Sequence, residues 1–121
     1  MPTQNRVYAP GENVTGRPTT AVVNRRFVAI AGNRVGGNVA IAPAAAGGRA
    51  FGVAADDAAI GQLVNVLRGG VVRVTAGGAI AAGAEVEAGA AGVAVTKTSG
   101  VALGYAITGA ANNAVAEIAL Y

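Results

Sequence analysis

The sequence of 121 residues contains no histidine and no cysteine, and only 12% of its residues are charged. Without an imidazole or a thiol, the chain cannot form histidine-based proton-transfer pairs, thiolate nucleophiles, disulfides or cysteine–zinc sites. The groups left for acid–base chemistry are six carboxylates, one lysine and three tyrosines. We therefore expect a protein that is not an enzyme and that has no catalytic residues, no cofactor and no bound metal.

Aromatic residues are scarce, at 4% of the chain, and tryptophan is absent. A protein that binds single-stranded nucleic acid needs several aromatic side chains along a basic groove, so we expect no nucleic-acid partner. A carbohydrate-binding surface needs an exposed aromatic platform, whereas Tyr8, Tyr105 and Tyr121 are scattered along the sequence. The longest uncharged stretch, residues 98–116, is broken by three glycines and two asparagines. With no secretory signal visible either, we expect no membrane partner.

Small residues dominate what is present: 30 alanines, 19 glycines and 18 valines make up 67 of the 121 positions. Valine and isoleucine together outnumber leucine 24 to 4, which favours pleated β-structure over helix. Strand faces built from alanine and glycine bury little area each, so the chain is expected to leave apolar surface for contacts with other proteins.

Short apolar or alternating runs, separated by turn residues, predict an all-β fold: a small β-barrel or sandwich of short antiparallel strands. Gly69-Gly70 lies between two such runs and predicts a hairpin. Residues 56–59 are expected to form one helical turn, and Glu85 and Glu87 to share a solvated strand face. The expected strands cover residues 27–31, 38–42, 50–54, 62–68, 71–75, 84–88, 93–96, 101–107 and 114–121.

The first twenty residues differ from the rest. They contain Pro2, Pro10 and Pro18 and show no apolar period. Because proline disfavours helices and central strands, this segment is predicted to contain no helix and no central strand. We therefore divide the chain into an extended basic arm, residues 1–20, and a β-barrel or sandwich domain, residues 21–121.

Charge is uneven along the chain. Residues 1–49 carry six arginines and one acid, a net charge of +5, whereas residues 50–121 carry three basic and five acidic residues, a net charge of −2. A basic front end on a nearly neutral body favours an acidic partner. The predicted docking residues lie in and just after the arm: Arg6, Arg17, Arg25 and Arg26.

The order of the motifs over roughly residues 20–121 resembles the small capsid decoration (cement) proteins of tailed phages. In that family a strand is followed by an I-x-A-G-x-x-V segment, a Gly-Tyr-Ala strand and a final strand ending in leucine. An upstream Phe-Gly-Val-Ala run at residues 51–54 and a strand at Gly61, Val64 and Val66 also fit. The matching positions are Ile80, Ala82, Gly83, Val86, Leu103, Gly104, Tyr105, Ala106, Ile118 and Leu120.

This resemblance implies a structural protein that binds the outer surface of an assembled phage capsid and stabilises it. Its partners would be the major capsid protein and further copies of itself, commonly as a homotrimer, and its location would be the exterior of the virion. Two alternatives remain open from the residues alone: a carbohydrate- or cell-surface-binding β-module, and a shell or tube subunit in its own right.

Overall fold

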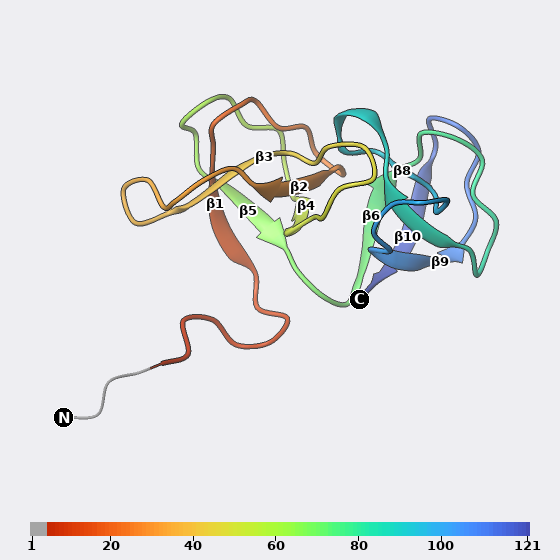
Figure 1. Cartoon of the computed structure of the whole chain (residues 1–121), viewed down its shortest axis with the longest axis horizontal. Helices are drawn as coiled ribbons and strands as arrows, with labels where there is room; N and C mark the ends of the chain where they lie inside the picture. The colour runs from red at the N-terminus through yellow and green to blue at the C-terminus, as the bar shows by residue number, and fades with distance from the viewer. Residues whose placement is uncertain (1–4) are drawn as a thin grey trace.

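The computed structural model in Figure 1 describes residues 5–121, which form ten β-strands and a single 3-10 turn, η1 (Ala90–Gly92). Within that range there is no α-helix, and thus no helix long and apolar enough to cross a membrane. The all-β prediction is confirmed. The strands are β1 (Val14–Pro18), β2 (Phe27–Ile30), β3 (Val39–Pro43), β4 (Gly52–Ala54), β5 (Val64–Leu67), β6 (Val71–Thr75), β7 (Glu85–Ala88), β8 (Ala94–Thr96), β9 (Gly104–Thr108) and β10 (Val115–Leu120).

The first five strands form a closed barrel in the order β1-β3-β2-β4-β5, and β1 pairs with β5 to close it. Four of the five pairings are antiparallel, but β1 and β3 run parallel. The expectation of purely antiparallel strands is therefore wrong at this pair. The reason is geometric: strand direction alternates around an antiparallel ring, and a ring of five strands cannot alternate throughout.

Strand β1 corrects the prediction that residues 1–20 contain no central strand, because it pairs with β3 on one side and with β5 on the other. Pro18 is the last residue of β1, so it removes no N–H from the residues before it, and Val14–Pro18 alternates between buried and more exposed positions. Gly16 faces the barrel core, where a Cβ atom would come within 2.7 Å of Cδ1 of Ile41. Residues 5–13 run up to β1 without a strand of their own (Figure 1), whereas residues 1–4 lie outside the described part of the chain. The division into an arm and a body stays a prediction.

The other five strands form a second sheet in the order β6-β10-β9-β7-β8. The hairpin predicted at Gly69-Gly70 is wrong, because β5 belongs to the barrel whereas β6 pairs with β10. Both glycines have the positive φ angles of a tight turn, +73° and +71°. Turn residues determine the local backbone conformation but not which strands pair. The Leu120 N–H donates to the Gly70 carbonyl at 2.9 Å, and this bond helps direct the chain into the second sheet.

The helical turn predicted at residues 56–59 is also wrong. The Asp57 carboxylate accepts a hydrogen bond of 2.8 Å from the Asn24 backbone N–H, and Ala58 forms an isolated β-bridge with Val22. An aspartate that bonds to backbone groups elsewhere competes with helix formation. Asp57 therefore ties two loops of the barrel together.

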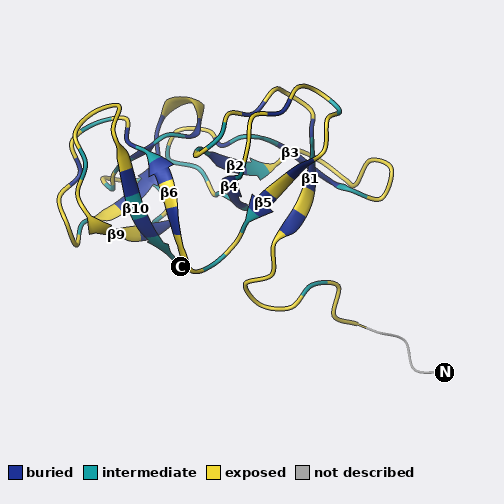
Figure 2. Ribbon diagram, turned by 180° about the vertical axis from the view of Figure 1, so that it is seen from behind, coloured by how far each residue is buried: buried dark blue, intermediate teal, exposed yellow. Residues whose placement is uncertain are grey.

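Two buried clusters hold the molecule together. One fills the barrel and includes Val14, Ile41 and Val66. The other lies at the junction and joins barrel residues, Phe27 among them, to Ile118 and other residues of the second sheet. Figure 2 shows buried residues on the strands of both sheets. The barrel and the sheet thus share a core.

Strand β9 of the second sheet buries small residues and exposes larger ones. On β9, Gly104 and Ala106 are buried, whereas Tyr105 and Ile107 are 43% and 47% exposed. A Cβ atom at Gly104 would collide with the Ala119 carbonyl, so the close packing of β9 and β10 requires this glycine. The outward residues Val71 and Val115 add to the apolar surface of the sheet.

Candidate docking surface

The structure places the four predicted docking arginines in three different parts of the molecule. Arg6 is exposed ahead of β1, and Arg17 lies half-buried on β1, beside Gly36 and Gly61. Arg25 and Arg26 form the turn that leads into β2. Of the four predicted docking residues, only Arg25 and Arg26 therefore lie together, and the four do not form one cluster.

The Arg25-Arg26 turn joins the barrel to the second sheet through its backbone. Arg25 has a φ of +62°, its N–H donates to the Ala54 carbonyl at 3.0 Å, and its own carbonyl accepts from Thr75 N–H at 2.8 Å. The Nε of Arg26 is buried and has no hydrogen-bond partner among the described residues. A strained backbone that carries two cations is consistent with a binding role as well as a structural one.

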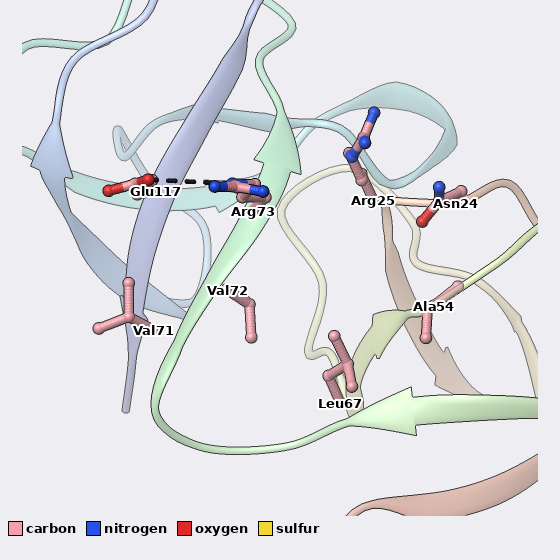
Figure 3. A pocket seen from close by; sticks show the side chains of 9 residues that line it. Asn24, Arg25, Ala54, Leu67, Val71, Val72, Arg73 and Glu117 are labelled. Carbon is pink, nitrogen blue, oxygen red and sulfur yellow. Dashed lines mark ion pairs between the residues drawn. The ribbon is translucent and has the colours of Figure 1, made fainter.

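Arg25 also borders a groove between the free side of β6 and the barrel, which we call the edge groove (Figure 3). Its volume is about 490 Å³. Val72 and Leu67 project into it from the sheet and the barrel, and Arg73 and Glu117 lie on its rim. The Arg73 Nε and Glu117 Oε2 atoms are 3.9 Å apart with both side chains well exposed, so this ion pair contributes little to stability.

A second groove at the junction was missed by the sequence analysis. Two hollows of about 200 and 260 Å³ share Arg49, Ala50, Phe51 and Arg68, and together we call them the arginine groove. The Arg68 guanidinium carbon lies 4.2 Å from the centre of the Phe51 ring, and its Nε donates to the Phe51 carbonyl at 2.9 Å. No acidic side chain lines either hollow.

One local signal for the arginine groove was present in the sequence. Arg49 and Phe51 are two residues apart, a spacing that places both side chains on one side of an extended segment. The arrival of Arg68 from the end of β5 could not be inferred, because it depends on the pairing of β4 with β5. The count of charges along the chain could not identify Arg49 and Arg68 as a pair, because they are 19 residues apart in the sequence.

Glu87 is not on a solvated face, which corrects the sequence-based expectation. It is 6% exposed, and one carboxylate oxygen accepts hydrogen bonds from the Thr98 backbone N–H at 2.5 Å and from the Thr98 hydroxyl at 2.9 Å. These bonds, the backbone bond first, lower the pKa of Glu87 below its ordinary value of 4.5. Glu85 remains exposed and accepts a hydrogen bond of 2.6 Å from the Tyr121 hydroxyl, which raises the pKa of Tyr121. Both carboxylates thus have structural partners.

The Glu87→Gln variant is expected to melt roughly 5 °C below the wild type at pH 7, because a neutral amide oxygen accepts the two Thr98 hydrogen bonds more weakly than the charged carboxylate does. The depressed pKa means that the folded state favours ionised Glu87. Its contribution is present above the ordinary pKa and is lost as the pH falls through the lower pKa of the folded state. Thermal melts from pH 7 down to about pH 3 should therefore show the two proteins converging.

Glu117→Gln is the matched control, since within residues 5–121 its carboxylate makes only the exposed pair with Arg73. Its melting temperature should stay close to that of the wild type throughout. A gap between Glu87→Gln and the wild type that stays constant at every pH would contradict the role given to the charge.

Comparison with known proteins identifies the fold. A model of the phage cement protein family matches residues 8–120. Among solved structures, the head fiber gp8.5 N base in bacteriophage phi29 is similar, with 25% identity and a TM-score of 0.77 over 91% of this chain and 93% of that chain. No curated protein matches the sequence.

The family match confirms the resemblance found in the motifs and extends it. It starts at Tyr8, so it includes β1 and part of the segment before it, which the motifs had left out. The similar phi29 structure covers both the barrel and the second sheet, since it matches 91% of the chain. The chain belongs to the phage cement protein family.

Proposed function

We propose that the protein is a non-enzymatic decoration protein that binds the outer surface of a phage capsid and stabilises it. The observation that carries this proposal is the match of the phage cement protein family to residues 8–120, nearly the whole chain. The similarity to a phage head fiber base supports a place in the virion. By bridging neighbouring shell subunits, each copy would add contacts that must be broken before the shell opens.

The proposed partner is the major capsid protein, contacted through carboxylates on its exterior. Arg6, Arg17, Arg25 and Arg26 are the proposed docking residues, and the net charge of +3 favours approach to an acidic surface. The planar guanidinium suits two-point contacts with carboxylates, which lysine cannot reproduce.

Self-association, as a homotrimer, is the second part of the proposal. Val71, Tyr105, Ile107 and Val115 leave apolar surface on the second sheet. Exposed apolar side chains of this kind favour contacts between subunits. Sedimentation of the free protein at micromolar concentration measures the oligomer, and a monomer alone would oppose this part.

The test of capsid binding uses shells that lack the protein and measures how much of it co-sediments with them. Binding is expected to weaken as salt rises from about 50 mM to about 500 mM, because exposed ion pairs are screened. Arg25→Ala should weaken binding up to about fivefold, the value of an exposed pair. Arg26→Ala should weaken it about tenfold or more, because the guanidinium of Arg26, whose Nε has no hydrogen-bond partner within residues 5–121, would lose a partly buried pair with a shell carboxylate.

Arg25→Lys and Arg26→Lys serve as controls that retain the charge but lose the planar fork, and melting temperatures exclude loss of folding. Absence of binding to the shells at any salt concentration would refute the proposed function. If binding does not change with salt and both alanine variants bind as well as the wild type, the apolar faces rather than the arginines would account for docking.

Carbohydrate binding is the alternative function, and one observation favours it. Two of the tyrosines that are scattered along the sequence lie together in the structure: the ring centres of Tyr105 and Tyr121 are 6.2 Å apart, and both side chains are exposed. The rings are tilted by 42°, so they do not form a flat platform. Binding to a glycan array that disappears in Tyr105→Ala would support this alternative.

A further inference from the structure

We propose that the arginine groove binds an extended acidic segment of the capsid subunit, with a carboxylate of that segment held by Arg49 and Arg68. This inference rests on the proposed function and assigns it a specific contact. The groove lies where the barrel meets the second sheet: Arg49 and Phe51 come from the loop before β4, and Arg68 directly follows β5. None of the docking residues predicted from the sequence lines it.

The guanidinium of Arg68 is held in place before any partner arrives. Stacking on Phe51 fixes its plane, and the bond from Nε to the Phe51 carbonyl fixes its direction. The terminal nitrogens donate to no residue within 5–121, and no carboxylate in that range forms a salt bridge with Arg49 or Arg68. A cation that is already ordered loses less conformational entropy on binding than a free arginine side chain.

The positive charge of the arginine groove favours a partner that carries negative charge. Its two arginines are unopposed, whereas the edge groove carries Glu117 beside Arg73. Two guanidinium groups offer paired N–H donors to a carboxylate, in the geometry that arginine favours. A negatively charged segment is therefore the complementary occupant.

Apolar residues on both sides of the arginines determine the rest of the occupant. Ile30, which is 54% exposed, lines one of the two hollows, and Val101, which is 44% exposed, lines the other. Leu103 and Leu120 line the second hollow. The best fit is an extended segment with its carboxylate between aliphatic side chains, because burying those side chains also removes water from the ion pair.

The same geometry disfavours nucleic acid as the occupant. A single strand would need aromatic faces for base stacking, and Phe51 already has the Arg68 guanidinium over its ring. Phe27, the other phenylalanine lining the groove, is 1% exposed and is buried in the junction core. Tyr121 lines the second hollow and is exposed, but its hydroxyl donates to the Glu85 carboxylate at 2.6 Å, and that negative charge would repel a phosphate backbone.

The experiment measures the affinity of full-length variants for purified shells that lack the protein. The double variant Arg49→Gln/Arg68→Gln removes two charges and should lose about tenfold or more in affinity, well beyond twice the small loss in binding free energy expected for Arg73→Gln, which removes one charge at an exposed arginine. Arg68→Glu should bind more weakly than Arg68→Gln, because a carboxylate partner repels the new charge. A short thymidine oligonucleotide should not displace the wild-type protein from the shells.

Each outcome has one meaning. Binding of the double variant at the strength of Arg73→Gln would overturn the assignment of the groove while leaving capsid binding intact. Equal binding of Arg68→Glu and Arg68→Gln would overturn an acidic partner, and displacement by the oligonucleotide would assign the groove to nucleic acid. Failure of the wild type to bind shells would refute the proposed function itself. Melting temperatures within a few degrees of the wild type establish that the variants fold.

Discussion

Replacing Ile118 by alanine should lower the free energy of unfolding by about 2–5 kcal/mol. Ile118 is fully buried on β10, in the cluster that joins the barrel to the second sheet. The substitution removes three carbon atoms from a site packed on all sides, so it loses both their transfer free energy and their contacts with the cavity walls. Few core residues in this alanine-rich chain are as large, and the effect should therefore be among the largest for a single side chain.

Urea unfolding curves measure this loss as a shift of the midpoint at an unchanged slope. Ile60→Ala is the matched control: it makes the same chemical change at a side chain that is 72% exposed, and its effect should stay within about 0.5 kcal/mol. Similar losses for the two variants would mean that the junction core does not carry the stability assigned to it.

Replacing Gly92 by alanine should cost about 2–5 kcal/mol, the sum of two separate effects. Gly92 ends the turn η1 with a φ of +82°, a conformation that costs alanine about 1–2 kcal/mol. A Cβ atom there would also collide with the backbone carbonyl of Phe27 on β2, which cannot move without disturbing the barrel. Overpacking of this kind adds about 1–3 kcal/mol.

Gly83→Ala separates the two effects. Gly83 has nearly the same φ, +84°, but a Cβ atom there meets nothing within 4 Å. Urea denaturation should show that both variants lose the free energy that the positive φ angle costs alanine. Gly92→Ala should be clearly less stable than Gly83→Ala, because only Gly92→Ala also has the collision. Equal stabilities would show that β2 and η1 can separate at little cost.

Nine of the ten strands were predictable because the short apolar or alternating runs that mark them are local features of the sequence. Each predicted run, from residues 27–31 to residues 114–121, contains all or most of one strand. The exception is β1, where Pro18 outweighed the alternation of Val14 and Gly16 in the sequence reading. The partners of the strands were less accessible: Gly69-Gly70 has hairpin chemistry, yet it joins two different sheets.

The candidate site was less predictable than the fold. Arg25 and Arg26 could be identified as a pair because they are adjacent in sequence, but their role in joining Ala54 to Thr75 depends on backbone contacts across the junction. The pairing of Arg68 with Phe51 likewise arises only after β4 and β5 pair. Motif order, by contrast, was enough to indicate the family, because it depends on the sequence alone.

The strand order of the two sheets determines the order in which they can fold during synthesis. All five barrel strands lie before residue 68, so the barrel can close while the remaining chain is still being made. In the second sheet, β10 is the last strand in sequence but lies between β6 and β9, so these two cannot be joined until it has left the ribosome. Until then the nascent barrel exposes the apolar side, including Phe27, that the finished junction covers. That interval is the stage at which the growing chain is most prone to aggregation.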